Sequence, residues 1–312
     1  MHLEWVVKAA NAKKHILIEK PVALCTEDFK VMIDACISNN VVMMDGTMFM
    51  HHKRFENLLE YFQDPSMGKF SHIRSSFSFN GSGESFMNEN IRVSSSGDPL
   101  GSLGDLGWYC IRLALMVYSG LTVRNIKENR VVWKSIPLIC TAKCFKWTDD
   151  GVPLECEACV GFGSKENPWE KRLTFDCSFL IPFREKFEIS IIGKNNALDQ
   201  VITCQDFVIP QFSHGATYTI TSVPTSALVD NATRVLSTTE NISFPECVQE
   251  ALMFDEMNRV ILNNSDDVSL KYFWYEVSYA TQAIIDACMT SMKQNGKDTE
   301  IKSPFIFNSN HF

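Results

Sequence analysis

A short apolar run near the start of the chain, Ile16-Leu17-Ile18, leads directly into Glu19-Lys20-Pro21. Three apolar residues suit a buried strand, and the strand must end at the proline, which cannot donate a hydrogen bond to a neighbouring strand. Open α/β sheets bind their ligands at the carboxyl ends of such strands. Lys20 is therefore either an active-site lysine that reaches a cofactor cleft or one half of a solvated ion pair at a strand end.

The segments around this strand predict a parallel sheet. Residues 2–14 and 29–38 have the apolar spacing of helices, the second opened by Thr26, and residues 41–44 form another apolar run. Helix, strand, helix and strand follow one another, as in a parallel sheet with crossover helices. Because two parallel strands cannot form a stable domain, we expect this part to belong to a larger one.

From Phe70 onward the pattern changes to the alternation of half-buried strands. Strands are predicted at residues 70–80, 138–147, 154–162, 173–181, 187–192 and 201–209, and helices at 103–118, 245–263 and 270–293. Gly, Asn, Asp and Pro clusters separate the strands, which favours a largely antiparallel sheet. The linker-like residues 63–68 place a domain boundary between a first domain, residues 1–65, and an α+β domain, residues 66–312.

The composition excludes several classes of function. A net charge of −8 argues against nucleic acid or an anionic membrane as a partner. No apolar run approaches the ~18 residues that span a bilayer. Eleven cysteines, an odd number, are scattered along the chain, and its first residues lack the pattern of a secretory signal. We therefore expect reduced thiols and a cytoplasmic protein.

A second informative stretch runs from Gly101 to Arg112. Asp105 and Tyr109 are four residues apart, so a helix would present both on the same side. A carboxylate and a phenol in that arrangement form a plausible proton-transfer pair. The alternative is an aspartate near a helix N-terminus with a tyrosine packed one turn later.

Together the two stretches carry a family resemblance. Glu19-Lys20-Pro21 followed later by Gly-Asp-Leu-Gly-Trp-Tyr resembles the glucose–fructose oxidoreductase, inositol dehydrogenase and MocA-type family. Within that family the chain is most similar to plant-type oxidoreductases related to dimeric dihydrodiol dehydrogenase. The segments that match this branch are residues 1–7, 45–48, 90–92 and 101–111.

The resemblance implies a fold, a cofactor and a substrate class. Residues 1–65 would be the C-terminal remnant of a Rossmann-type parallel sheet, and residues 66–312 an open, mostly antiparallel sheet with helices on one face. The cofactor would be NADP or NAD. The reaction would be hydride transfer to or from a sugar-like or cyclic diol or carbonyl compound.

The same resemblance assigns roles to individual residues. Lys20, Tyr109 and Asp105 would be catalytic, with Tyr109 as general acid and Asp105 on the substrate. We expect the Lys20 ammonium to lower the pKa of Tyr109 towards neutrality. The cofactor side would be formed by Glu19, Lys20, Pro21 and His2, and the substrate pocket by Phe49, Arg92 and Trp108.

The sequence also departs from the family pattern. The family opens with a strand, Gly-x-Gly-x-x-Gly and a helix, and no such glycine motif occurs in the 312 residues. We therefore expect an N-terminally truncated form of such an enzyme. The alternative is a catalytically inactive binding or oligomerisation module derived from one.

Three weaker signals complete the analysis. Cys156 and Cys159 would point to opposite faces of their strand, so they cannot converge with Cys140 and Cys144, and we expect no metal site. The pair at residues 51–52 suggests either a phosphate contact or a solvated helix start. Alternation in the predicted strands leaves apolar residues on both sheet faces, which predicts a homodimer through the open face.

Overall fold

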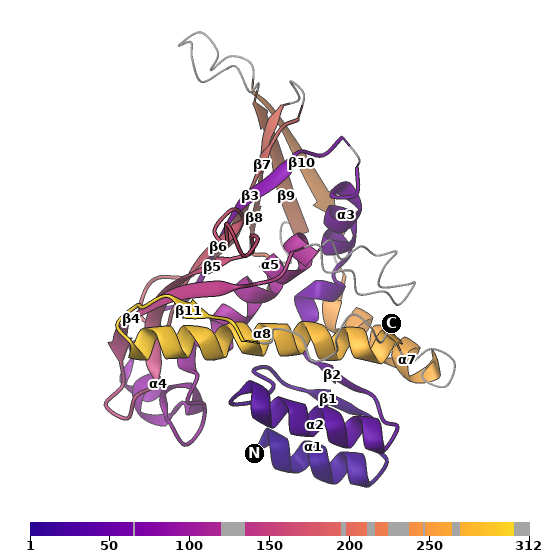
Figure 1. The fold of residues 1–312 in the computed structure, drawn as a ribbon, viewed down its shortest axis with the longest axis vertical. Coiled ribbons are helices and arrows are strands. Elements are labelled where there is room, and N and C mark those ends of the chain that lie inside the picture. Colours follow the sequence, from indigo (N-terminus) through magenta and orange to yellow (C-terminus); the bar gives the residue numbers. More distant parts are fainter. Residues whose placement is uncertain are drawn as a thin grey trace.

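The structure is a computed structural model that describes residues 1–64, 66–119, 135–194, 198–210, 216–223, 237–245, 247–263 and 269–302. A small two-stranded sheet and a large nine-stranded sheet lie on either side of the long helix α8, Ser269–Lys293 (Figure 1). This arrangement confirms the predicted combination of a parallel sheet with a larger, mostly antiparallel one. Pro65, part of the expected linker, lies outside the described residues. The domain boundary at this point stays a prediction.

The small part has the predicted order of elements. It consists of α1 (His2–Asn11), β1 (Ile16–Ile18), α2 (Thr26–Ser38) and β2 (Met43–Asp45). Strands β1 and β2 pair in parallel, with Ile18 opposite Asp45. Helix α2 begins earlier than expected, because the Phe29 N–H already bonds the Cys25 carbonyl, 3.2 Å away.

The large sheet has the strand order β10-β9-β8-β7-β3-β6-β5-β4-β11. Its only parallel pair among the described strands is β3 with β6. Six of its strands were predicted: β3 (Lys69–Ser78), β4 (Ile139–Trp147), β5 (Pro153–Gly161), β6 (Arg172–Ser178), β7 (Arg184–Ile192) and β8 (Asp199–Gln205). Three were missed, namely β9 (Ala216–Val223), β10 (Thr238–Phe244) and β11 (Thr299–Glu300).

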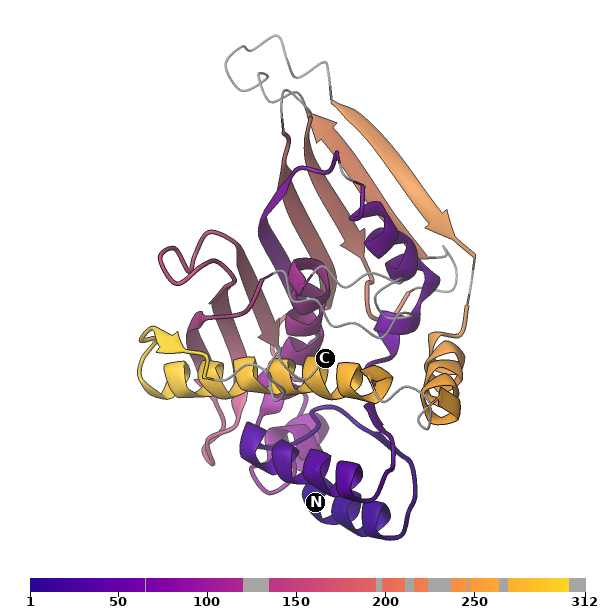
Figure 2. The same ribbon diagram turned by 45° about the vertical axis from the view of Figure 1, so that its right-hand side comes forward.

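Helices α3, α5 and α8 lie on one face of the large sheet (Figure 2). Helix α5 (Trp108–Ser119) packs on β3 and β6, α8 on β4, and α3 (Lys53–Tyr61) on β9 and β10. Helix α7 (Gln249–Asn263) contacts the 3₁₀ turn η1 (Met48–His51). Beneath the helices lie the inward residues of the sheet, among them Leu173, Phe175, Cys177, Phe187 and Ile189, all buried.

Along β3, β6 and β7 the opposite face of the sheet is mainly polar, which corrects one expectation. The residues of β3, β6 and β7 that alternate with the buried ones are mainly polar or charged, including Arg74, Thr174, Asp176, Glu188 and Ser190. Arg74 and Glu188 form an ion pair there, 3.1 Å apart. The expected apolar excess on both faces is therefore wrong for most of these strands, because most of their large apolar side chains point to the helices. Ile192, at the end of β7, is an exception that lies on the open face and is 50% exposed.

His52 is buried and His51 half-buried, and they do not form a solvated helix start. His52 caps α3, where its Nδ1 accepts a hydrogen bond from the Arg54 N–H at 3.0 Å. The ring of His51 stacks on Trp274, with a centroid distance of 5.1 Å. Burial lowers the pKa of both histidines to about 4, so both rings are neutral at pH 7 and neither suits a phosphate.

A buried ion pair joins the small sheet to the helices. Arg112 of α5 donates to the carboxylate of Asp45, at the end of β2, over 2.6 Å, and both side chains are buried. Ser278 of α8 also donates to this carboxylate, and Arg112 reaches Thr281 at 2.9 Å. Burial alone would raise the pKa of Asp45, yet the guanidinium and the hydrogen bonds hold it below its usual value.

We expect Arg112→Met to destabilise the protein by about 3–5 kcal/mol, because it leaves the Asp45 charge buried without its partner. Urea unfolding followed by circular dichroism measures the loss. Arg74→Met is the control, since it breaks an exposed ion pair and should cost under about 1 kcal/mol. Equal losses in the two variants would contradict a special role for the buried pair.

Candidate active site

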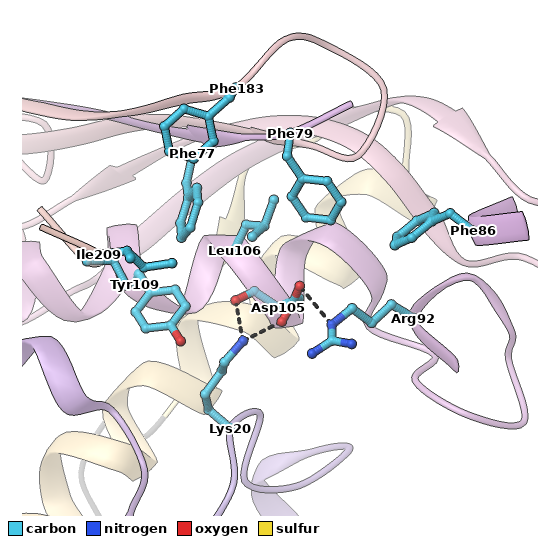
Figure 3. Close-up of a pocket in the computed structure, with 11 residues that line it drawn as sticks. Lys20, Phe77, Phe79, Phe86, Arg92, Asp105, Leu106, Tyr109, Phe183 and Ile209 are labelled. Carbon is cyan, nitrogen blue, oxygen red and sulfur yellow. Dashed lines mark hydrogen bonds and ion pairs between the residues drawn. The ribbon is translucent and has the colours of Figure 1, made fainter. Parts of the chain in front are cut away.

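A pocket of about 410 Å³ opens where the end of β1 meets the helical face of the large sheet (Figure 3). It brings together residues from distant parts of the sequence. Its lining consists of Lys20, Phe77, Phe79, Phe86, Arg92, Asp105, Leu106, Tyr109, Phe183, Val208 and Ile209. The three residues predicted to be catalytic, Lys20, Asp105 and Tyr109, all belong to this set.

Lys20 leaves the end of β1 and points into the pocket. Its ammonium bonds the backbone carbonyl of Asp105 at 2.9 Å and pairs with the carboxylate of the same residue. Pro21 follows through a cis peptide bond and packs on Gly104. A Cβ at Gly104 would lie 2.5 Å from Leu100 Cβ and 3.2 Å from Pro21 Cγ, so only glycine allows this close packing.

Asp105 lies in a single π-helical turn, η3 (Leu103–Gly107), that continues directly into α5. Such turns are rare and occur often at functional sites. The carboxylate is 9% exposed and lies between two cations, Lys20 and Arg92, the latter with Nε 3.0 Å from Asp105 Oδ2. The ion pair of Lys20 is therefore buried, and the solvated pair considered from the sequence is wrong.

Tyr109 lies beside Lys20, but its pKa moves in the direction opposite to the expected one. The Lys20 ammonium lies 4.8 Å from the centre of the Tyr109 ring (Figure 3), and the phenol hydroxyl donates to the sulfur of Met48 at 3.8 Å. Burial, followed by the negative charge of Asp105, raises the pKa of Tyr109 well above its usual value. Because Asp105 already neutralises Lys20, the phenol stays protonated at neutral pH.

Aromatic side chains form the far wall of the pocket, which sequence reasoning missed. Phe77 and Phe79 come from the end of β3, Phe86 from α4 (Glu84–Glu89), and Phe183 from the loop before β7 (Figure 3). Phe79 and Phe86 meet edge to face, with centroids 5.5 Å apart. Phe183 is 56% exposed and forms part of the rim. Only the unusual number of phenylalanines, 22 in the chain, hinted at such a wall.

Two predicted substrate residues do not line the pocket. Trp108 is buried, and its indole N–H donates to Thr47 Oγ1 at 2.8 Å. Phe49 is also buried and meets the Tyr109 ring edge to face, with centroids 5.9 Å apart. The third, Arg92, does line the pocket, and its side chain is 41% exposed.

The residues predicted for the cofactor side lie around the end of β1. The ring of His2 contacts the Val22 carbonyl through Nδ1 at 3.2 Å. The Glu19 carboxylate approaches Gly46, where a Cβ would be 3.5 Å away. Among the described residues no group of three His, Cys, Asp or Glu side chains could hold a metal ion, and no described helix has the length and apolar character to cross a membrane.

Comparison with known proteins supports the resemblance found in the sequence. The family model described as "Oxidoreductase family, NAD-binding Rossmann fold" matches residues 1–47. The predicted resemblance is confirmed. An uncharacterized oxidoreductase of Rhizobium meliloti is 30% identical over 119 residues, and trans-1,2-dihydrobenzene-1,2-diol dehydrogenase of Danio rerio is 26% identical over 130. These matches span 38% and 42% of this chain, but only 34% and 37% of the relatives.

A solved structure of the same fold extends the likeness to almost the whole chain. KijD10, a 3-ketoreductase from Actinomadura kijaniata in complex with NADP and TDP-benzene, superposes with a TM-score of 0.69 at 16% identity. The superposition covers 93% of this chain and 74% of KijD10. At this identity the likeness shows that the two chains share a fold.

We expect the Tyr109 phenol to stay protonated in the folded protein beyond the pH at which an ordinary tyrosine ionises, because burial and Asp105 both disfavour the phenolate. Ultraviolet absorbance at 295 nm, titrated for the wild type and for Tyr109→Phe, isolates this one tyrosine by difference. Circular dichroism at each pH shows where the fold persists. A difference with a midpoint below pH 10 would contradict this and restore the activated phenol expected from the sequence.

Proposed function

We propose that this chain provides the substrate site of an NAD(P)-dependent oxidoreductase that acts on a ring compound with a hydroxyl or carbonyl group. The observation that carries the proposal is the meeting of Lys20, Asp105 and Tyr109 in one pocket beside the end of a parallel strand. Families with this fold place the nicotinamide at that position. A strand-end ion pair alone would not bring a protonated phenol and a second cation to the same cavity.

The pocket residues can take different roles in the reaction. A carbonyl oxygen at the polar end of the pocket would accept hydrogen bonds from the Lys20 ammonium and the Tyr109 hydroxyl. With its pKa raised, Tyr109 is a proton donor to the oxygen in the reductive direction. Asp105 holds Lys20 in place and offers a carboxylate oxygen to a neighbouring substrate hydroxyl. When bound, the nicotinamide supplies or receives the hydride.

The cofactor fits the residues present at its nicotinamide end. Lys20, Pro21 and His2 surround the end of β1, where that ring would lie against the pocket. The pyrophosphate end has no Gly-x-Gly-x-x-Gly in the 312 residues to receive it. An inactive binding or oligomerisation module is therefore the second candidate, and cofactor binding decides between the two.

The shape of the pocket favours one part of the predicted substrate class. Its polar groups, Lys20, Asp105 and Arg92, gather at one end, while phenylalanines and the aliphatic side chains of Leu106, Val208 and Ile209 form the rest (Figure 3). A sugar needs hydrogen-bonding partners all round its ring, because buried hydroxyls without partners are costly. A cyclic diol or carbonyl with an apolar ring face matches these surroundings better.

We expect the chain to bind NADPH or NADH with sub-millimolar affinity, measured by the change in nicotinamide fluorescence. In a protein that turns over, Tyr109→Phe should lose about 10²–10⁴-fold in rate, because a positioned general acid is gone, and should still bind cofactor. Tyr61→Phe is the control, since Tyr61 bonds Gln200 away from the pocket and its loss should leave the rate unchanged. Absence of binding by either nucleotide would favour the inactive module.

We also propose a homodimer through the open face of the large sheet. Its support is the face itself, which no described helix covers (Figure 2) and which carries mainly polar and charged side chains along β6 and β7. Such a face suits an interface of hydrogen bonds and water more than one of apolar contacts.

A cytoplasmic setting fits the eleven free thiols.

We expect Ser190→Arg to convert a dimer to a monomer in light scattering, because Ser190 lies on β7, a central strand of that face. A long charged side chain there would separate two sheet faces that meet by two-fold symmetry. Glu89→Arg on the exposed part of α4 is the control and should leave the dimer intact. A wild-type protein that is monomeric at micromolar concentration would rule the interface out.

A further inference from the structure

The segment that follows β8, residues 206–209, forms one side of the pocket and is called the wall segment below. Two of its residues, Val208 and Ile209, line the pocket directly. Phe207 anchors it in the core, with its ring edge-on to Phe49 and Phe187 at centroid distances of 5.6 Å. The position of this segment therefore sets the width of the cavity.

Buried polar side chains from separate elements hold the backbone of the wall segment. Arg54 of α3 donates to the carbonyls of Asp206, at 3.1 Å, and Phe207, at 2.8 Å. Gln249 of α7 donates to the carbonyl of Val208 at 2.8 Å. Arg54 and Gln249 are 1% and 6% exposed, so neither contact competes with water.

Glu185 of β7 provides the third contact to the wall segment. Of the three side chains, its carboxyl group is the one that can change charge near neutral pH. Its Oε1 accepts hydrogen bonds from the N–H of Val208 and from the N–H of Ile209, the latter at 2.9 Å. The residue is 1% exposed, and its other oxygen, Oε2, is buried without a hydrogen-bond donor among the described residues. A carboxylate with one oxygen unpaired in a protein core is poised to take up a proton there.

We propose that Glu185 is a positioning residue for the pocket, and that its carboxylate form holds Val208 and Ile209 more tightly than its protonated form does. Hydrogen bonds to a charged acceptor are roughly twice as strong as those to a neutral one. Protonation at Oε2 leaves Oε1 as a neutral acceptor, so the wall segment is bound less firmly at low pH. The pocket would then bind substrate more tightly as pH rises.

The surroundings of Glu185 set where this change occurs. Burial raises the pKa of Glu185 to about 7; its two backbone hydrogen bonds and Arg54 oppose the rise, while Asp206 adds to it. The other titratable groups that its charge reaches are Tyr109 and Cys110 of α5 and Cys204 of β8, and burial raises the pKa of all three. Those three groups therefore stay neutral near pH 7.

The titration of Glu185 should affect the stability of the whole fold and the binding of the wall segment in opposite directions. A carboxyl group whose pKa is raised on folding favours the folded state below its unfolded pKa of 4.5, and this contribution is lost as pH rises through about 7. The contribution of Glu185 to the free energy of unfolding therefore falls over the same pH range in which its hydrogen bonds to the wall segment become stronger. Local and global effects of pH have opposite signs.

The decisive experiment is nuclear magnetic resonance of the ¹⁵N-labelled full chain between pH 5 and 9. We expect the amide signals of Val208 and Ile209 to shift with one shared midpoint near pH 7, and their exchange, corrected for intrinsic rates, to slow above it. In Glu185→Gln the shared transition should disappear. Glu188→Gln, on the outer face of the same strand, is the matched control and should keep it.

Two results would overturn the proposal. One is that the amide signals of Val208 and Ile209 in the wild type do not shift between pH 5 and 9. This test uses the wild type alone and so does not depend on the folding of a variant. The other is the same transition in Glu185→Gln. The role of the wall segment in binding a substrate rests on the proposed function. The titration of Glu185 can be observed whether or not that function is correct. If the protein turns over, KM should fall several-fold from pH 6 to 8 in the wild type and stay flat in Glu185→Gln.

Discussion

The buried pair of Asp45 and Arg112 is the contact on which the candidate site depends. It joins the end of β2 to α5, and Ser278 of α8 completes the hydrogen bonds of the carboxylate. Because α5 continues without a break from the π-turn that carries Asp105, the guanidinium that neutralises Asp45 also fixes Asp105 and Tyr109 relative to the small sheet. Lys20 leaves that sheet from the neighbouring strand, so its meeting with Asp105 follows from the same contact.

Within the pocket, charge and burial act against each other. Lys20 and Arg92 are two positive charges facing the single negative charge of Asp105, so the lining is left with an excess of one positive charge. That excess favours an electron-rich oxygen in the cavity. It does not activate Tyr109, because the carboxylate that holds Lys20 also faces the phenol and burial disfavours the phenolate. The site is thus built to donate protons rather than to accept them.

The sequence predicted the parts of this site that depend on local pattern. Lys20 is marked by the end of an apolar strand, and the spacing of Asp105 and Tyr109 by the helical period. The aromatic wall escaped prediction, because Phe86 and Phe183 lie in short or irregular segments and only the folded chain brings them together. Strand β10 was missed for a different reason: its polar sequence carries no alternation, and β9 supplies all its described pairing.

The burial of Glu185 could have been predicted from the alternation of residues along β7. Glu185 lies two residues before Phe187, and strand residues two apart face the same side, so the alternation that buries Phe187 and Ile189 also buries this carboxylate. Glu188, an odd number of residues away, faces solvent and pairs with Arg74. A charged residue on the apolar phase of a strand breaks the local rule, and such exceptions gather at functional sites. Glu185 and two polar side chains buried on helices, Arg54 and Gln249, all bind the backbone segment that borders the pocket.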